Sequence, residues 1–200
     1  MDRMKPRDAQ LIQFLSQLEK PYLTVADLEK ILGLKRASLY VTLHRLVRYG
    51  VLERLRRGVY HLALRPADVP RIANLLYMPS YLSFESALAR YGILSQIPYA
   101  VTFATTRRSK RMTLGGTAVE FHQLRRDLFF GYTLENGLYV AEPEKALLDE
   151  LYLVKRGKAS LELSELRLDD LSLEKALAYA TRFPPSVQET ARKLMTLADN

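Results

Sequence analysis

The side chains best suited to chemistry gather in one short segment, residues 35–48, whose spacing predicts a helix with two different faces. Leu39, Leu43 and Leu46 recur at helical spacing and predict a buried face. Cations near the ends of such a helix can hold phosphates, and polar side chains in its N-terminal half can reach base edges in the major groove of DNA. The candidate DNA-contacting residues are Lys35, Arg36, Ser38, Tyr40, Thr42, His44, Arg45 and Arg48.

Two helices are predicted before this basic segment. Residues 7–18 carry apolar side chains at helical spacing, and Pro21 ends that helix. Thr24 stands as an N-cap before a short helix over residues 25–32, which has Asp27 in its first turn and Gly33 just past its end. A short capped helix and a glycine turn are typical of a helix-turn-helix. This context favours DNA contact over the alternative, which is an ordinary solvated helix face.

A β-hairpin is predicted after the basic helix. Residues 51–54 and 59–62 favour strands, and residues 55–58, which end in Gly58, form a tight turn between them. Three helices followed by a hairpin predict a winged helix-turn-helix over residues 1–65. We expect the wing residues Arg54, Arg56 and Arg57 to contact the phosphate backbone or the minor groove. The alternative is that their charge protects an edge hairpin from aggregation.

The distribution of charge supports a polyanionic partner for the first third of the chain. Residues 1–65 hold 13 Lys and Arg against 6 Asp and Glu, whereas residues 66–200 hold 17 against 16, so almost all of the formal net charge of +8 lies at the N-terminal end. The chain has 200 residues and no cysteine, which excludes disulfides and thiolate metal sites. It has neither an apolar run of membrane-spanning length nor a signal-peptide core, so we expect a cytoplasmic protein with no membrane partner.

The rest of the chain predicts a second domain. Three prolines between residues 66 and 80 indicate a linker there. Beyond it, a helix is predicted over residues 84–91, strands over 99–105, 111–114, 117–124 and 137–141, and helices over 143–154, 173–182 and 185–197. The predicted fold class is therefore α+β: an N-terminal winged helix-turn-helix over residues 1–65, a linker over 66–80, and a mixed α/β domain over 81–200 that ends in helices.

A second group of cations lies in the β part of this domain. It consists of Arg107, Arg108, Lys110, Arg111, Arg125 and Arg126. One interpretation is a second nucleic-acid or nucleotide contact. The other is a charged hairpin rim, because no aromatic residues alternate with the arginines as they do in a stacking surface.

Acidic residues near position 145 raise the question of catalysis. Glu142 and Glu144 with Lys145 and Asp149 could hold Mg²⁺ and position a water molecule in a nuclease. However, Pro143 predicts a helix start, where acidic residues are common, and Lys145 and Asp149 then predict a surface pair at i,i+4 spacing. The three histidines lie in separate elements and no phosphate loop is present, so we expect no enzyme activity, no metal and no cofactor.

Several segments of the chain, taken in order, resemble the AbiEi antitoxin family. They are YLSFESAL at residues 81–88, YG at 91–92, VTFATTRR at 101–108, FFGY at 129–132 and AEPEKALLD at 141–149. With the winged helix, the resemblance covers about residues 8–155. Residues from about 156 onwards match no family pattern.

The resemblance implies an antitoxin of a type IV toxin–antitoxin system that also represses its own operon. Its expected partners are double-stranded DNA, at inverted repeats in its own promoter, and a nucleotidyltransferase-like toxin that it opposes without a stable complex. Two alternatives remain open: a winged-helix regulator that senses a small ligand through residues 81–200, and a nuclease on a winged-helix carrier.

Overall fold

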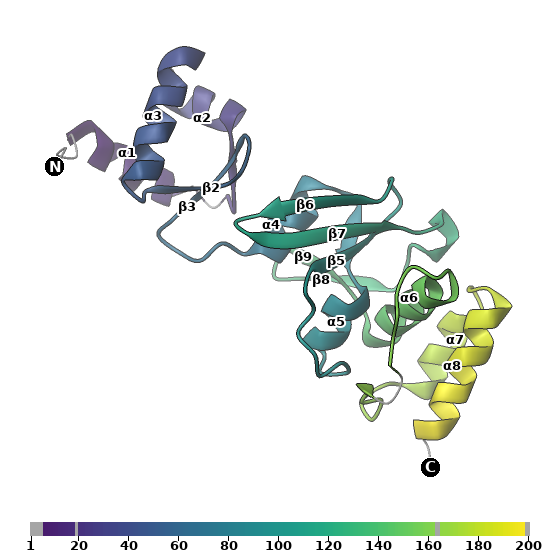
Figure 1. The fold of residues 1–200 in the computed structure, drawn as a ribbon. Helices are drawn as coiled ribbons and strands as arrows, with labels where there is room; N and C mark the ends of the chain where they lie inside the picture. Colours follow the sequence, from purple (N-terminus) through teal and green to yellow (C-terminus); the bar gives the residue numbers. More distant parts are fainter. Residues whose placement is uncertain (1–5, 19, 163–164, 199–200) are drawn as a thin grey trace. The chain divides into compact units, whose positions relative to one another are not determined.

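The computed structural model describes residues 6–18, 20–162 and 165–198, and the chain divides into two compact units (Figure 1). The N-terminal unit contains the chain up to Ile72 together with Thr113–Thr117. The C-terminal unit contains residues 73–112 and the chain from Ala118 onwards.

The N-terminal unit has the predicted order of three helices and a hairpin. Its antiparallel sheet has the strand order β1-β3-β2, with β1 as a two-residue third strand beside the wing. The elements are α1 (Pro6–Ser16), β1 (Leu23–Thr24), α2 (Val25–Leu32), α3 (Arg36–Arg48), β2 (Leu52–Arg56) and β3 (Val59–Leu62). The winged helix-turn-helix predicted from the sequence is thereby confirmed.

Leucines spaced along the helices build the core of this unit. Leu39, Leu43 and Leu46 form the inner face of α3 and are buried against Leu15 and Leu28 from the two preceding helices. The spacing of four and three residues keeps them on one side of the helix. The opposite side of α3 is therefore left to solvent.

The start of α2 is fixed by a reciprocal cap. Thr24 Oγ1 accepts a hydrogen bond from the Asp27 backbone N–H at 3.1 Å, and Asp27 Oδ2 accepts one from the Thr24 N–H at 2.9 Å. Lys20 Nζ lies 2.8 Å from Asp27 Oδ1. The hydrogen bond from Lys20, followed by those from Thr24, lowers the pKa of Asp27 to about 2. Gly33 ends the helix in the left-handed conformation, with φ of 60°.

The elements that follow the winged helix are α4 (Val69–Leu76), β4 (Ser80–Leu82), α5 (Phe84–Arg90), β5 (Val101–Thr105), β6 (Lys110–Leu114), β7 (Thr117–Gln123), the 3-10 turn η1 (Arg126–Leu128), β8 (Tyr132–Glu135), β9 (Leu138–Ala141), α6 (Pro143–Lys155), α7 (Leu173–Ala180) and α8 (Pro185–Ala198). A mixed six-stranded sheet, in the order β6-β7-β5-β4-β9-β8, forms the centre of the C-terminal unit. β5 and β7 are parallel, as are β4 and β9. Helix α6 packs against α5, α7 and α8.

The segment expected to be a linker, residues 66–80, contains regular structure. Helix α4 occupies Val69–Leu76, and β4 begins at Ser80. Pro70 lies in the first turn of α4, where its missing N–H leaves no helical hydrogen bond unmade. Asp68 Oδ1 accepts a hydrogen bond from the Arg71 N–H at 3.1 Å at the same helix start. Pro70 therefore marks the first turn of a helix rather than part of an irregular linker.

The pair Lys145 and Asp149 is completely buried, so the prediction of a surface pair was wrong. Both side chains have 0% exposure and form an ion pair inside the C-terminal unit. Lys145 Nζ also donates to the Tyr81 hydroxyl at 2.8 Å, while Asp149 Oδ2 accepts from Tyr81 at 2.9 Å and from Ser83 Oγ at 2.8 Å. Burial lowers the pKa of Lys145 and raises that of Asp149, and their mutual contact opposes both shifts.

We predict that Lys145→Met lowers the free energy of unfolding by about 3–5 kcal/mol, because it leaves a buried carboxylate without its cation. Urea unfolding followed by circular dichroism measures the loss. The matched control is Lys193→Met, which breaks the exposed i,i+4 pair with Glu189 in α8 and should change stability little. Combining Lys145→Met with Asp149→Leu should recover much of the loss. Equal, small effects of Lys145→Met and Lys193→Met would contradict the structural role of the buried pair.

We predict that Asp27→Asn destabilises the N-terminal unit at neutral pH and that the difference from the wild type disappears in acid. The pKa of Asp27 is about 2 in the folded chain, below the ordinary value of about 3.9. Its stabilising effect is therefore complete well above pH 4 and is lost as the pH falls through about 2. Urea unfolding from pH 6 to pH 2 tests this, with Glu29→Gln, at an exposed position of α2, as the control. A difference that does not depend on pH would contradict it.

Candidate nucleic-acid interface

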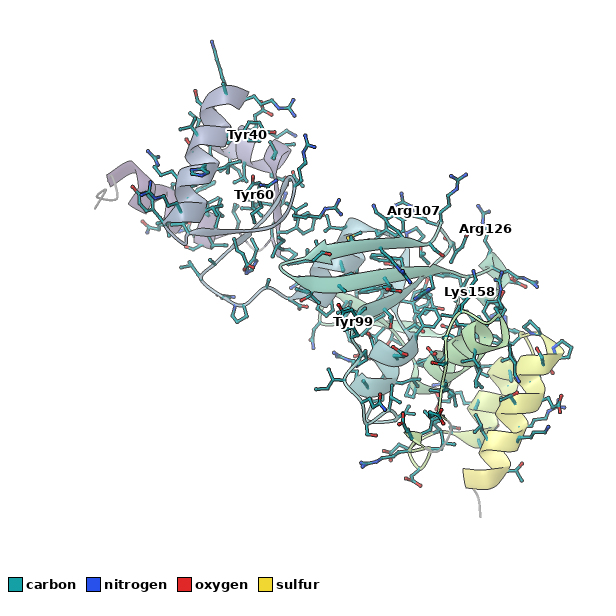
Figure 2. The ribbon with its side chains drawn as sticks, viewed as in Figure 1. Tyr40, Tyr60, Tyr99, Arg107, Arg126 and Lys158 are labelled. Carbon is teal, nitrogen blue, oxygen red and sulfur yellow. The ribbon has the colours of Figure 1, made fainter. Side chains whose placement is uncertain are left out.

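The outer face of α3 carries most of the candidate DNA-contacting side chains. Lys35 occupies the N-cap position of α3, Arg36 is the first residue of the helix and Arg48 is its last. Tyr40, labelled in Figure 2, is exposed although it is aromatic. Thr42 and Arg45 are half-buried at the border of this face, and the Thr42 hydroxyl donates to the Ser38 carbonyl at 3.0 Å. The exposed candidates of α3 are Lys35, Arg36, Ser38, Tyr40, His44 and Arg48.

The positive potential at the N-terminus of α3 is not offset by a capping side chain or by an acidic residue in the first turn. No side chain caps it and its first turn has no acidic residue, whereas Thr24 and Asp27 cap α2. The free N–H groups of a first turn and the positive end of the helix dipole attract anions. Lys35 and Arg36 add two full positive charges at the same end, so a phosphate beside the start of α3 would meet only positive potential from this helix.

The wing is longer and its turn tighter than the sequence predicted. Strand β2 continues to Arg56, so the connection to β3 is reduced to Arg57 and Gly58. The register shifts between Arg54 and Arg56, and Gly58 adopts φ of 80°, which favours glycine. Arg54 and Arg57 are exposed, while Arg56 is half-buried.

Sheet topology brings the two halves of the second basic group together. β5 and β7 are parallel and in register at Thr105 and Gln123, so both strands end at one edge of the sheet. The Leu124 N–H donates to the Thr105 carbonyl at 2.8 Å, and the Gln123 N–H donates to Ser109 Oγ at 3.0 Å. The residues after β5 thus lie beside those after β7, and Figure 2 shows Arg107 and Arg126 at this end. We call Arg107, Arg108, Lys110, Arg111, Arg125 and Arg126 the sheet-end cluster.

Most cations of the sheet-end cluster already have protein partners. The Arg107 guanidinium lies 4.1 Å from the centroid of the Tyr77 ring, and Lys110 Nζ lies 4.7 Å from the same centroid. Arg111 Nε is 3.1 Å from Glu120 Oε1, and Arg125 pairs with Asp127. Arg108 and Arg126 are exposed, and within the described residues neither forms an ion pair. These two side chains are the ones left for an external anion.

The acidic residues considered for catalysis are occupied by the protein itself. Glu144 is buried and accepts a hydrogen bond from the Ser172 N–H at 3.0 Å, and Lys175 Nζ lies 3.4 Å from carboxylate oxygens of both Glu142 and Glu144. The Tyr179 hydroxyl donates to Glu142. In the described part of the chain, no three His, Asp or Glu side chains lie close enough together to hold a metal ion.

The three histidines belong to different surroundings. His44 is exposed on α3. The ring nitrogens of His61 lie 3.1 Å from the Pro21 carbonyl and 2.8 Å from the Arg65 carbonyl, within the N-terminal unit. His122 lies on β7, 3.5 Å from Glu120, and burial lowers its pKa. Only His44 faces outwards from the candidate interface.

Two apolar residues of the outer face escaped the sequence analysis. Ala37 and Val41 are exposed on α3 among the basic and polar side chains. Apolar residues of a predicted helix are normally assigned to its core. Only their angular position, opposite Leu39, Leu43 and Leu46, could have identified them.

The N-terminal unit is a winged helix-turn-helix domain with an exposed basic face on α3. Residues 10–63 match the family model described as "Transcriptional regulator, AbiEi antitoxin", and the resemblance found in the sequence is confirmed over this segment. The crystal structure of the RV2827C protein from Mycobacterium tuberculosis is similar over 98% of this chain and 79% of that chain, with a TM-score of 0.69 and 19% identity. At this identity the likeness concerns the fold alone. No curated protein sequence matches the chain.

None of the helices in the described part of the chain combines the length and the apolar character that crossing a membrane requires.

Proposed function

We propose that this protein is the antitoxin of a type IV toxin–antitoxin system and represses its own operon by binding inverted repeats in its promoter. The observation that carries the proposal is the exposed basic face of α3, in a domain whose sequence matches the AbiEi regulator family. The toxin it opposes is a nucleotidyltransferase-like protein, without a stable complex between the two. The protein has no catalytic role of its own.

In this proposal the winged helix binds DNA through two kinds of contact. Lys35, Arg36 and Arg48 neutralise phosphates on either side of the major groove. Ser38, Tyr40 and His44 reach base edges, with Thr42 and Arg45 at the border of the contact. The wing adds Arg54 and Arg57 on the backbone or in the minor groove, with Arg56 behind them.

In this proposal residues 1–65 bind DNA and residues 81–200 provide antitoxicity. The segment 66–80, which contains α4, connects these two parts of the chain. Within the second part, the sheet-end cluster is the candidate surface for antitoxicity or for a second nucleic-acid contact. Arg108 and Arg126 are its most available charges because they have no ion-pair partner among the described residues.

Arg36→Ala should weaken binding to a duplex from the region upstream of the gene and reduce its salt dependence. Log affinity falls with log salt, and each lost phosphate contact makes this slope less steep by about 0.9. Fluorescence anisotropy between 50 and 300 mM salt measures both quantities, with a random duplex for comparison. The control is Arg192→Ala, which removes an exposed positive charge from α8. If Arg36→Ala and Arg192→Ala have the same slope as the wild type, α3 does not contact phosphate through Arg36.

The antitoxin activity should depend on the sheet-end cluster and not on α3. With the neighbouring toxin gene expressed from an independent promoter, the full-length chain should restore growth, and Arg36→Ala should restore it equally well. The double variant Arg108→Glu and Arg126→Glu should fail, whereas Arg192→Glu should succeed. Western blots confirm equal protein levels. Full rescue by the double variant would remove the sheet-end cluster from antitoxicity, and no rescue by the wild type would overturn the antitoxin proposal itself.

A further inference from the structure

Val41 is an unusual residue for its position in α3. Its side chain is 72% exposed in the middle of the helix, while Leu39 and Leu43 beside it are buried. A β-branched residue loses rotamer freedom in a helix, and an exposed one gains no burial in return. Neither helix formation nor core packing accounts for a valine here.

Helical geometry places Val41 at the centre of the outer face. Successive residues turn by about 100°, so Leu39, Leu43 and Leu46 define the direction of the core. The line opposite to them runs through Ala37, Val41, His44 and Arg48, all of which are exposed. The N-terminal half of this line is therefore apolar and its C-terminal half is polar or cationic.

The N-terminal half of a recognition helix is the part that contacts base edges in the major groove. The 5-methyl group of thymine is the apolar feature that the bases present there, and small apolar side chains such as alanine pack against it. A valine opposite cytosine would instead cover a polar amino group. Ala37 and Val41 are one turn apart on the same line, so they can meet methyl groups at neighbouring base pairs.

We propose that Val41, supported by Ala37, reads thymine methyl groups and so determines part of the sequence preference of this domain. The inference rests on the proposed DNA-binding function and adds an apolar, specificity-determining contact to the polar ones. Ser38 and Tyr40 border the line on its two sides, and their hydroxyls can bond the polar edges of the adjacent bases.

The test removes single methyl groups from the DNA. The wild-type chain first selects its site from a pool of random-sequence duplexes, and each thymine of the selected duplex is then replaced by uracil, which lacks only the methyl. Fluorescence anisotropy should show at least one position per half-site where this replacement weakens wild-type binding about fourfold, the value for one buried methyl group. Val41→Ser should bind thymine and uracil duplexes equally at that position.

Two further variants separate this contact from general effects. Ala37→Ser should lose sensitivity to uracil at a neighbouring position. Ile97→Ser removes a side chain that is 95% exposed in the C-terminal unit and should keep the wild-type pattern. Circular dichroism verifies that the helices of each variant remain formed.

The outcomes distinguish the two proposals. If the wild type selects no sequence over random DNA, the DNA-binding function itself fails. If it selects a site but uracil is tolerated at every position, or weakens Val41→Ser as much as the wild type, then DNA binding stands and thymine recognition by Val41 is overturned.

Discussion

The C-terminal unit is organised around the need to keep one buried ion pair fully satisfied. Lys145 and Asp149 have no access to water, and moving such charges out of water costs several kcal/mol each unless every donor and acceptor finds a partner. Tyr81, the middle residue of β4, and Ser83, the residue after the strand, supply the missing partners. These hydrogen bonds therefore hold α6 in one position along β4 and in one orientation about its own helix axis.

The same requirement shapes the neighbouring segments. The rings of Phe130 and Phe183 lie 5.1 and 5.2 Å from Lys145 Nζ, and a side chain on Gly131 would come within 3.2 Å of Lys145 Cγ. Gly131 also has φ of 66°, so both its conformation and its surroundings require glycine. Three of the five segments that carry the family resemblance beyond the winged helix, 81–88, 129–132 and 141–149, thus meet around one buried lysine.

Capping and turn residues correctly predicted the elements that are defined by interactions between neighbouring residues. They did not predict which side chains are buried, because burial depends on residues far apart in the sequence. Thr24, Asp27 and Gly33 bound α2 because a cap and a left-handed turn are properties of a few consecutive residues. Lys145 and Asp149 have the spacing of a surface pair, and nothing in that spacing records the tyrosine and serine more than 60 residues away that make burial tolerable. The basic side chains after β5 and β7 were recognised, but their convergence follows from parallel pairing, which is not encoded in either strand alone. Val41 was missed for a different reason, since only polar and charged side chains were considered as candidates for DNA contact.

The two units use their positive charges differently, and this difference bears on which one dominates binding to a polyanion. Within the described residues, no carboxylate pairs with Lys35, Arg36 or Arg48, so these three cations have no ion pair to break before they can neutralise phosphate. In the sheet-end cluster Arg111 and Arg125 have carboxylate partners, and a phosphate must displace or share them. Each phosphate that a protein newly neutralises releases counterions and so adds to affinity. Under the proposed function, Lys35, Arg36 and Arg48 would therefore contribute more per cation than the paired cations of the sheet-end cluster. That cluster would make a weaker contact through Arg108 and Arg126, while Arg107 and Lys110 lie over the ring of Tyr77.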